Sequence, residues 1–204
     1  MTLELTSPPP MERAAAATPG ALRRFSVAEY HEMLAKGVLP EDERVELLEG
    51  LIVAKMPHDP IHDAIVQVVD VALRKALPSE WFVRVQSAMT IAASEPEPDL
   101  VVHRGDPRSF LHRHPGVADV VLIVEVANSS LQRDREWKAA INARAGIEYW
   151  IVNLVDGVVE RYSMPIVLPG GVTSYRDRVQ LRGDDVIVPP VPGASAIRVG
   201  DLLP

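Results

Sequence analysis

One stretch of the chain, residues 120–127, is almost continuously apolar. Seven of its eight residues are apolar and most of these are β-branched: Val120-Val-Leu-Ile-Val-Glu-Val-Ala127. This pattern is typical of a strand that is buried on both faces. Glu125 interrupts it near the end. A buried carboxylate needs a cationic partner, N–H donors or a metal, because desolvating its charge is costly. The pattern leaves open whether Glu125 belongs to a structural ion pair or to a functional site.

Two elements are predicted near the N-terminal end of the patterned region. A capping box should start a helix directly after Ser26, and Gly37 should end it. A hairpin is expected over residues 44–54, because Glu49 and Gly50 suit a tight turn between two short apolar arms.

A second helix should begin with Asp59 as N-cap and Pro60 as its first residue, and Pro78 should stop it. Apolar residues recur along this segment at helical spacing. The buried face is therefore predicted to contain Ile61, Ile65, Val68, Val69 and Leu73.

The rest of the chain alternates between strands and one more helix. A helix of about fifteen residues, ended by Gly146, is expected between the strand over 120–127 and a strand over 148–154. This βαβ arrangement predicts a parallel, right-handed connection. The other expected segments are strands over 81–91, 99–102, 158–162, 175–181 and 186–188, and a long loop over 103–118 that carries several cationic or titratable groups.

Length, composition and charge limit the classes of protein to which this chain can belong. A chain of 204 residues suggests one domain. Residues 1–24 are rich in Pro and Ala and are expected to form a mobile tail, with a single domain over 25–204. The absence of cysteine excludes disulfides and thiolate zinc sites.

Neither a leader nor a membrane span is recognisable, so a cytoplasmic protein is expected. The net charge of −7 argues against a protein that coats nucleic acid, but not against a local basic site.

Two sets of polar residues can be explained without a catalytic or metal-binding role. The local pattern places Glu46 on a solvent-facing strand position. His58 and His62 are four residues apart, which suggests a zinc pair. However, Asp59 as N-cap leaves His58 outside the helix, so the two rings should not simply stack on one helix face and no shared zinc is expected.

A third set points to chemistry. Asp99 precedes a short strand, Glu125 lies near the end of another, and Lys138 lies on the connecting helix. Lys138 shares a helical stripe with Asp134 and Ile141, so its ammonium group can point towards the sheet. Two carboxylates at neighbouring strand ends suit Mg²⁺ or Mn²⁺. The alternatives for Lys138 are an exposed helix lysine or an i,i+4 partner of Asp134.

Here the chain resembles the PD-(D/E)XK nuclease superfamily, and within it the bacterial family of Uma-type restriction endonucleases. The resemblance covers about residues 25–165 and is carried by the order and spacing of several short motifs. These are Glu46-Leu-Leu-Glu-Gly50, His62 ahead of its helix, Val85-Gln86, Pro96-Glu-Pro-Asp99-Leu, Glu125-Val, Asp134 with Lys138, and Gly146-Ile-Glu-Tyr-Trp-Ile-Val152.

The resemblance implies an α/β (α+β) fold with a restriction-endonuclease-like core, in which helices flank a mixed, bent central sheet. It implies Asp99 and Glu125 as metal ligands, Lys138 as the catalytic lysine, and Glu46 as an accessory acid and metal ligand. His62 and Gln86 would line the site and contact the substrate. The chain departs from the superfamily motif two residues after Glu125, where Ala127 replaces the lysine. Lys138 would have to act from the helix instead.

The expected function is therefore metal-dependent hydrolysis of DNA phosphodiester bonds, with Mg²⁺ or Mn²⁺ as cofactor. A homodimer would suit cleavage of both strands, and no membrane partner is expected. Two alternatives remain at this stage. One is an inactive descendant of the fold that binds nucleic acid or protein, and the other is a metal-dependent phosphoesterase acting on a smaller substrate.

Overall fold

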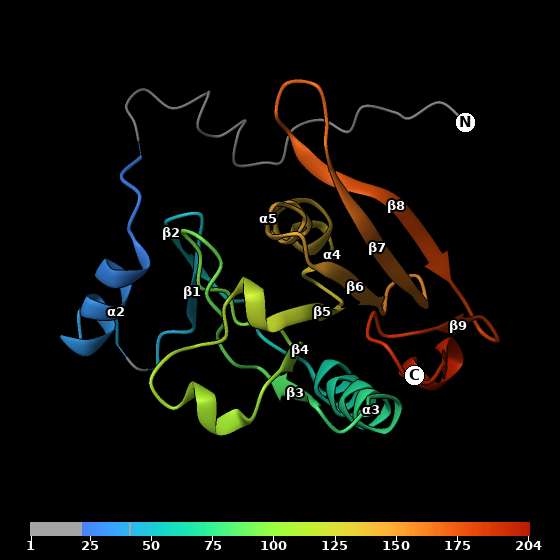
Figure 1. The fold of residues 1–204 in the computed structure, drawn as a ribbon. Coiled ribbons are helices and arrows are strands. Elements are labelled where there is room, and N and C mark those ends of the chain that lie inside the picture. Colours follow the sequence, from blue (N-terminus) through green and yellow to red (C-terminus); the bar gives the residue numbers. More distant parts are fainter. Residues whose placement is uncertain (1–21, 41) are drawn as a thin grey trace.

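The computed structural model describes residues 22–40 and 42–204 (Figure 1). Its centre is a six-stranded mixed sheet with the strand order β3-β4-β5-β6-β7-β8. The β5–β6 pair is parallel, as the βαβ pattern predicts, and the other neighbouring pairs are antiparallel. The strands are β3 (Trp81–Val85), β4 (Leu100–Arg104), β5 (Val120–Ala127), β6 (Glu148–Asn153), β7 (Val158–Val167) and β8 (Thr173–Leu181).

Helices and smaller sheets surround this sheet. The first helix, α2 (Val27–Ala35), is followed by the hairpin of β1 (Val45–Leu48) and β2 (Leu51–Ala54) and then by α3 (Pro60–Ala76). The helix after β5 has three parts: α4 (Leu131–Arg133), a π-helical turn (Asp134–Lys138) and α5 (Ala139–Ala145). Near the C-terminus, β9 (Val186–Ile187) pairs with β10 (Ile197–Arg198), and 3₁₀ turns occur over Pro107–Phe110, Val117–Asp119 and Val199–Leu202.

β5 lies between two apolar layers, as its sequence predicts. Alternate residues such as Val124 pack in the same cluster as Ile65 and Val69 of α3. The intervening residues, such as Ile123, pack in a second cluster with Ile141 of α5. Figure 1 shows α3 and α5 on opposite sides of the sheet. By the same alternation, the side chain of Glu125 belongs to the face that α5 covers.

The short capping motifs in the sequence predict the boundaries of several helices correctly. Ser26 and Glu29 form the predicted capping box at the start of α2. Asp59 caps α3, its carboxylate accepting a hydrogen bond from the N–H of His62. Gly146 ends the helix after β5 with a φ of 76°, a left-handed conformation that glycine adopts at low cost.

Two strand boundaries differ from the prediction. The strand that starts at Trp81 ends at Val85 rather than at residue 91, because Gln86 has a φ of 44° and its N–H binds the carbonyl of Asp99. β7 continues to Val167, well beyond the predicted residue 162. Its outer half is held mainly by pairing with β8, so it leaves little hydrophobic pattern in the sequence.

The buried face of α3 is also narrower than predicted. Ile65, Val69 and Leu73 are buried, but Ile61 and Val68 are 43% and 38% exposed. The sheet covers only one arc of the helix, and Ile61 lies at the end of the helix, beyond the packed layer. The expected tail over residues 1–24 falls outside the described part of the chain except at residues 22–24. None of the helices in the described ranges combines the length and hydrophobicity that a membrane crossing requires.

A matched pair of substitutions on α3 tests this packing. We expect Ile65→Ala to lower the free energy of unfolding by ~2–5 kcal/mol, because it leaves a cavity in the core. Ile61→Ala removes the same atoms from the same helix at an exposed position and should cost less than ~1 kcal/mol. Urea unfolding of both variants measures the difference, and similar losses would contradict the orientation of α3.

Candidate active site

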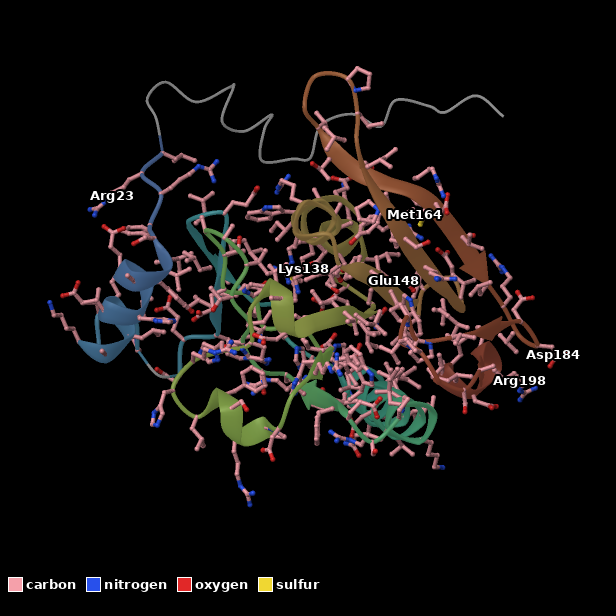
Figure 2. The ribbon with its side chains drawn as sticks, in the orientation of Figure 1. Arg23, Lys138, Glu148, Met164, Asp184 and Arg198 are labelled. Atoms are coloured by element: carbon pink, nitrogen blue, oxygen red, sulfur yellow. The ribbon has the colours of Figure 1, made fainter. Side chains whose placement is uncertain are left out.

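The structure brings Glu46, Asp99, Glu125 and Lys138 into one pocket. They come from β1, from the residue before β4, from β5 and from the end of the π-helical turn. All four are buried, with exposed fractions of 1%, 6%, 4% and 7%. In Figure 2, Lys138 lies in the crowded middle of the molecule, whereas Arg23 extends outward from its edge.

Strand pairing places Asp99 next to Glu125. Leu100 of β4 pairs with Val124 of β5, so the preceding residue on one strand lies beside the following residue on the other. The N–H of Val126 donates to Oδ2 of Asp99 at 2.9 Å, and the N–H of Asp99 donates to Oε2 of Glu125 at 3.4 Å. The two carboxylates are therefore fixed at the same end of two core strands.

The ammonium group of Lys138 lies among three carboxylates. Its Nζ is 2.7 Å from Oε1 of Glu125, and 3.8 Å both from Oε1 of Glu46 and from Oδ1 of Asp134. Asp134 and Lys138 mark the first and last residues of the π-helical turn. Turns of this kind are frequent at functional sites. Lys138 is only 7% exposed, so the alternative of an exposed helix lysine is wrong, whereas the i,i+4 pairing with Asp134 is present as a buried contact.

The expectation that Glu46 faces solvent is also wrong. A segment distant in sequence covers β1: the backbone N–H of Glu95 donates to the carbonyl of Leu47 at 2.7 Å. The N–H of Glu97 donates to Oε2 of Glu46 at 3.3 Å. The alternation within β1 could not reveal this long-range cover, whereas the motif resemblance placed Glu46 in the site.

Carboxyl groups outnumber cationic groups in the immediate surroundings of Lys138. Four buried carboxyl groups, those of Glu46, Asp99, Glu125 and Asp134, are near its ammonium group. Burial raises the pKa of Glu125 well above its ordinary value, and the nearby Asp99 and Asp134 raise it further against the attraction of Lys138. The pKa of Lys138 is also raised, because its three carboxylate neighbours outweigh the cost of burial.

A divalent cation would satisfy several carboxylate oxygens of this arrangement. Oε1 of Glu46 and Oδ1 of Asp134 are buried without a hydrogen-bond partner among the described residues, and unpartnered carboxylate oxygens are costly. The carboxylates of Glu46, Asp99 and Glu125 are of the ligand type that Mg²⁺ or Mn²⁺ prefers, whereas the donor atoms of this pocket that already lie within 4.8 Å of one another belong to His58, His62 and Asp99. A bound cation would also offset the excess negative charge.

His62 supports Asp99 from the first turn of α3. Its Nε2 is 3.2 Å from Oδ2 of Asp99. Burial lowers the pKa of His62, but the hydrogen bond and charge of Asp99 outweigh it and raise the pKa overall. Burial would raise the pKa of Asp99, but His62, the N–H of Val126 and the charge of Lys138 together lower it. Asp99 is therefore ionised at neutral pH.

The neighbouring His58 lies outside α3, as predicted from the N-cap at Asp59. The rings of His58 and His62 stack from different segments rather than from one helix face, with the centroids 4.1 Å apart. Gln86 is exposed and does not line the pocket, although its Nε2 donates to Nδ1 of His58 at 3.2 Å.

Two basic residues of the pocket were not singled out from the sequence. Lys55, just after β2, contacts Oε2 of Glu97 at 2.6 Å, and Arg133 donates to the carbonyl of Ala54 at 3.0 Å. Their place in sequence, beside a strand end and in a helix, gave no signal of their role. The cationic loop over 103–118 contributes no residue to the lining of this pocket within the described part of the chain.

A second buried network holds the helix that carries Lys138. Arg135, in the π-helical turn, binds the carboxylate of Glu160 on β7, with Nε 3.1 Å from both oxygens. Asn153 and Tyr162 each donate to the same carboxylate at 2.7 Å. Burial would raise the pKa of Glu160, but these partners, above all Arg135, lower it.

Comparison with known proteins agrees with this fold. A solved structure from Anabaena variabilis, titled "Crystal structure of a putative nuclease belonging to DUF820", superposes with a TM-score of 0.63. The match covers 87% of this chain and 97% of that one at 17% identity, so it shows a shared fold. No curated protein sequence matches the chain.

The mixed sheet and its buried acid–lysine pocket thus define an α+β protein with a nuclease-type fold. More specifically, the chain belongs to the Uma2 family, described as "Putative restriction endonuclease", whose family model matches residues 27–200.

The Glu160 network gives a pH-dependent prediction. Glu160→Gln should lower the free energy of unfolding by ~1–3 kcal/mol at pH 7, because Arg135 loses its charged acceptor. The folded-state pKa of Glu160 is lowered, so its stabilisation is present above its ordinary value of 4.5 and fades as the pH falls below it. Urea unfolding at pH 7 and pH 4 should show a smaller difference between wild type and variant at pH 4. Equal differences at both pH values would contradict the ion pair.

Proposed function

We propose that this protein is a metal-dependent endonuclease that hydrolyses DNA phosphodiester bonds, with residues 25–204 acting as one domain. Membership of the Uma2 family supports nuclease activity in general. The observation that supports the finer proposal most strongly is the buried Lys138, 2.7 Å from Glu125 in a pocket with excess carboxylate charge. That combination suits phosphoryl chemistry, where a cation and an ammonium group must meet a negatively charged phosphate.

Asp99 and Glu125, with Glu46 beside them, would hold Mg²⁺ or Mn²⁺. When bound, such a cation offsets phosphate charge and lowers the pKa of a coordinated water. His62 would keep Asp99 ionised and fixed through the contact between its Nε2 and Oδ2 of Asp99. Asp134, paired with Lys138 across the π-helical turn, would help to hold that ammonium group in place.

Lys138 would supply the fixed positive charge. Its raised pKa keeps the ammonium group protonated at neutral pH, so it can donate hydrogen bonds to an attacking water or to a phosphate oxygen. A preorganised donor of this kind stabilises charge that develops in the transition state. In this role Lys138 orients the attacking water and stabilises the negative charge that develops on the phosphate. A different group, with a lower pKa, would have to accept the proton of the water.

DNA would approach from the side where the pocket opens between its basic residues. Lys55 and Arg133 line the pocket, and Arg44 lies within 3.5 Å of His58, which also lines it. Guanidinium and ammonium groups are the usual contacts to DNA phosphates. Arg44 is exposed and available for such a contact, whereas the Lys55 side chain is only 12% exposed and is paired with Glu97 at 2.6 Å. The basic groups near the pocket support a DNA substrate despite the overall charge of −7. A two-fold dimer would allow the cleavage of both strands.

The proposal predicts how Lys138 affects activity. Lys138→Met keeps most of the side-chain volume but removes the charge, and plasmid nicking with Mg²⁺ or Mn²⁺ should slow by ~10²–10³. Asp99→Asn keeps the shape but removes a metal-binding charge, and it should nick as slowly or more slowly. Nicking should stop when EDTA removes the cation.

Two controls separate chemistry from folding. Ile141→Ala lies on the same helix and is 4% exposed, so it should lose ~2–5 kcal/mol of stability yet nick normally well below its unfolding temperature. Lys36→Ala, an exposed lysine on the surface, should change neither property. Wild-type nicking by Lys138→Met alongside an inactive Asp99→Asn would show that the lysine is misassigned. A wild type that cuts no DNA with any cation would favour a binding protein or a phosphoesterase for smaller substrates.

A further inference from the structure

A second cluster of metal-binding side chains lies outside the pocket described above. His31 comes from α2, Glu95 from the segment before β4, and His114 from the loop between β4 and β5. Nε2 of His31 is 2.5 Å from Oε1 of Glu95, and Nε2 of His114 is 3.9 Å from the same oxygen. One donor atom from each residue lies within 4.8 Å of the other two. Three segments distant in sequence therefore meet at one carboxylate oxygen.

The carboxylate is a fixed anchor. Glu95 is only 3% exposed, and the hydroxyl of Thr90 donates to its Oε2 at 3.2 Å. That contact leaves Oε1 facing the two imidazoles. The backbone of Glu95 is also fixed, because its N–H and C=O both pair with Leu47 of β1. An anchored carboxylate is the rigid part that a metal site needs.

The two histidines are free to adjust around it. The side chains of His31 and His114 are 48% and 39% exposed, so they can rotate and an ion can reach them. Tetrahedral zinc binds nitrogen and oxygen at ~2.0–2.2 Å, which places two ligand atoms roughly 3.4 Å apart. Rotation of the exposed imidazoles would have to bring the observed spacings of 2.5 and 3.9 Å to that value.

A hydrogen bond between His31 and Glu95 alone would account for only half of this arrangement. It leaves unexplained why Nε2 of His114 faces the same oxygen from another loop, with its ring centroid 6.1 Å from that of His31. The adjoining cavity is lined by Arg84, Glu95 and Glu97, and Glu97 is already paired with Lys55 at 2.6 Å, so Glu95 is the carboxylate that faces the imidazoles.

We propose that His31, Glu95 and His114 form a second metal site, which binds a zinc-class divalent ion, with water in the fourth position. Two imidazoles and one carboxylate are a donor set typical of Zn²⁺, whereas the carboxylates around Glu125 suit Mg²⁺ or Mn²⁺. The site does not depend on the proposed nuclease activity.

Such an ion would connect three parts of the fold. It would tie α2 to the loop between β4 and β5 through Glu95, which is four residues before Asp99. The segment between these two residues also contains Glu97, whose N–H binds Glu46. The second site would therefore stabilise the loop that carries the active-site acid, without being part of the reaction.

Zinc titration of the full-length chain tests the proposal. Because His58, His62 and Asp99 also lie within ligand distance of one another, the titration is done in a background of His58→Ala with Asp99→Asn, which removes that group. We expect this background to bind one Zn²⁺ in isothermal titration calorimetry. In the same background, adding His114→Ala should weaken binding by at least ~100-fold, because losing a ligand costs more than losing a supporting residue.

His112→Ala is the matched control. It removes an exposed histidine two residues away in the same loop, outside the cluster, and should bind Zn²⁺ as tightly as the background. Glu95→Gln provides a second test of the site should His114→Ala fold poorly, as judged by circular dichroism. Equal zinc affinity in His114→Ala and His112→Ala, or no zinc binding by the background, would overturn the proposal.

Hydrogen exchange tests the connection itself. Zinc should slow the exchange of amides in residues 27–35 in the background and in His112→Ala, but not in His114→Ala, whose changed residue lies on another element. Unchanged exchange in α2 despite zinc binding would show that the ion does not join these segments. Both measurements read binding and protection directly, so they remain informative even if the chain cuts no DNA.

Discussion

The buried contact between Lys138 and Glu125 is the interaction on which the site depends. An ion pair buried this deeply repays the cost of desolvation only when its geometry is good and the surrounding groups are satisfied. Here the geometry is good, at 2.7 Å, but the surroundings carry more negative charge than one ammonium group can balance. The fold therefore holds a local electrostatic imbalance in its core, which is characteristic of a functional site.

Several parts of the fold maintain this imbalance. β5 is buried on both faces, so Glu125 cannot turn away to solvent. The β4–β5 register brings Asp99 alongside it, and the π-helical turn aims Lys138 at the pair. The ion pair between Arg135 and Glu160 holds that turn against β7 on its other side. The supporting residues are therefore as important to the site as those that line it.

The sequence predicts those features that local physics controls. The limits of β5, the capping of α2 and α3, and the βαβ order follow from hydrophobic runs and short polar signals. Asp99, Glu125 and Lys138 could be grouped because strand ends and helix stripes restrict where side chains point. Features that depend on distant segments could not be predicted from local pattern. Glu46, for example, is buried because residues 95–97 cover it.

The π-helical turn is the clearest case of a feature hidden from the sequence. A regular helix over the same residues satisfies the same apolar spacing, so the pattern does not reveal the extra residue in the turn. The exposed outer half of β7 was not predicted because it is held by pairing with β8, which leaves no hydrophobic alternation in the sequence. The family resemblance adds what local pattern lacks, since it relates residues that are far apart in the chain.

A divalent cation would balance the carboxylates around Lys138. Anomalous diffraction from crystals grown with Mn²⁺ locates such an ion without relying on activity. We expect a manganese peak within about 2.0–2.6 Å of carboxylate oxygens of both Asp99 and Glu125. A well-ordered pocket with no manganese there, and Glu125 still bound only to Lys138, would contradict this expectation.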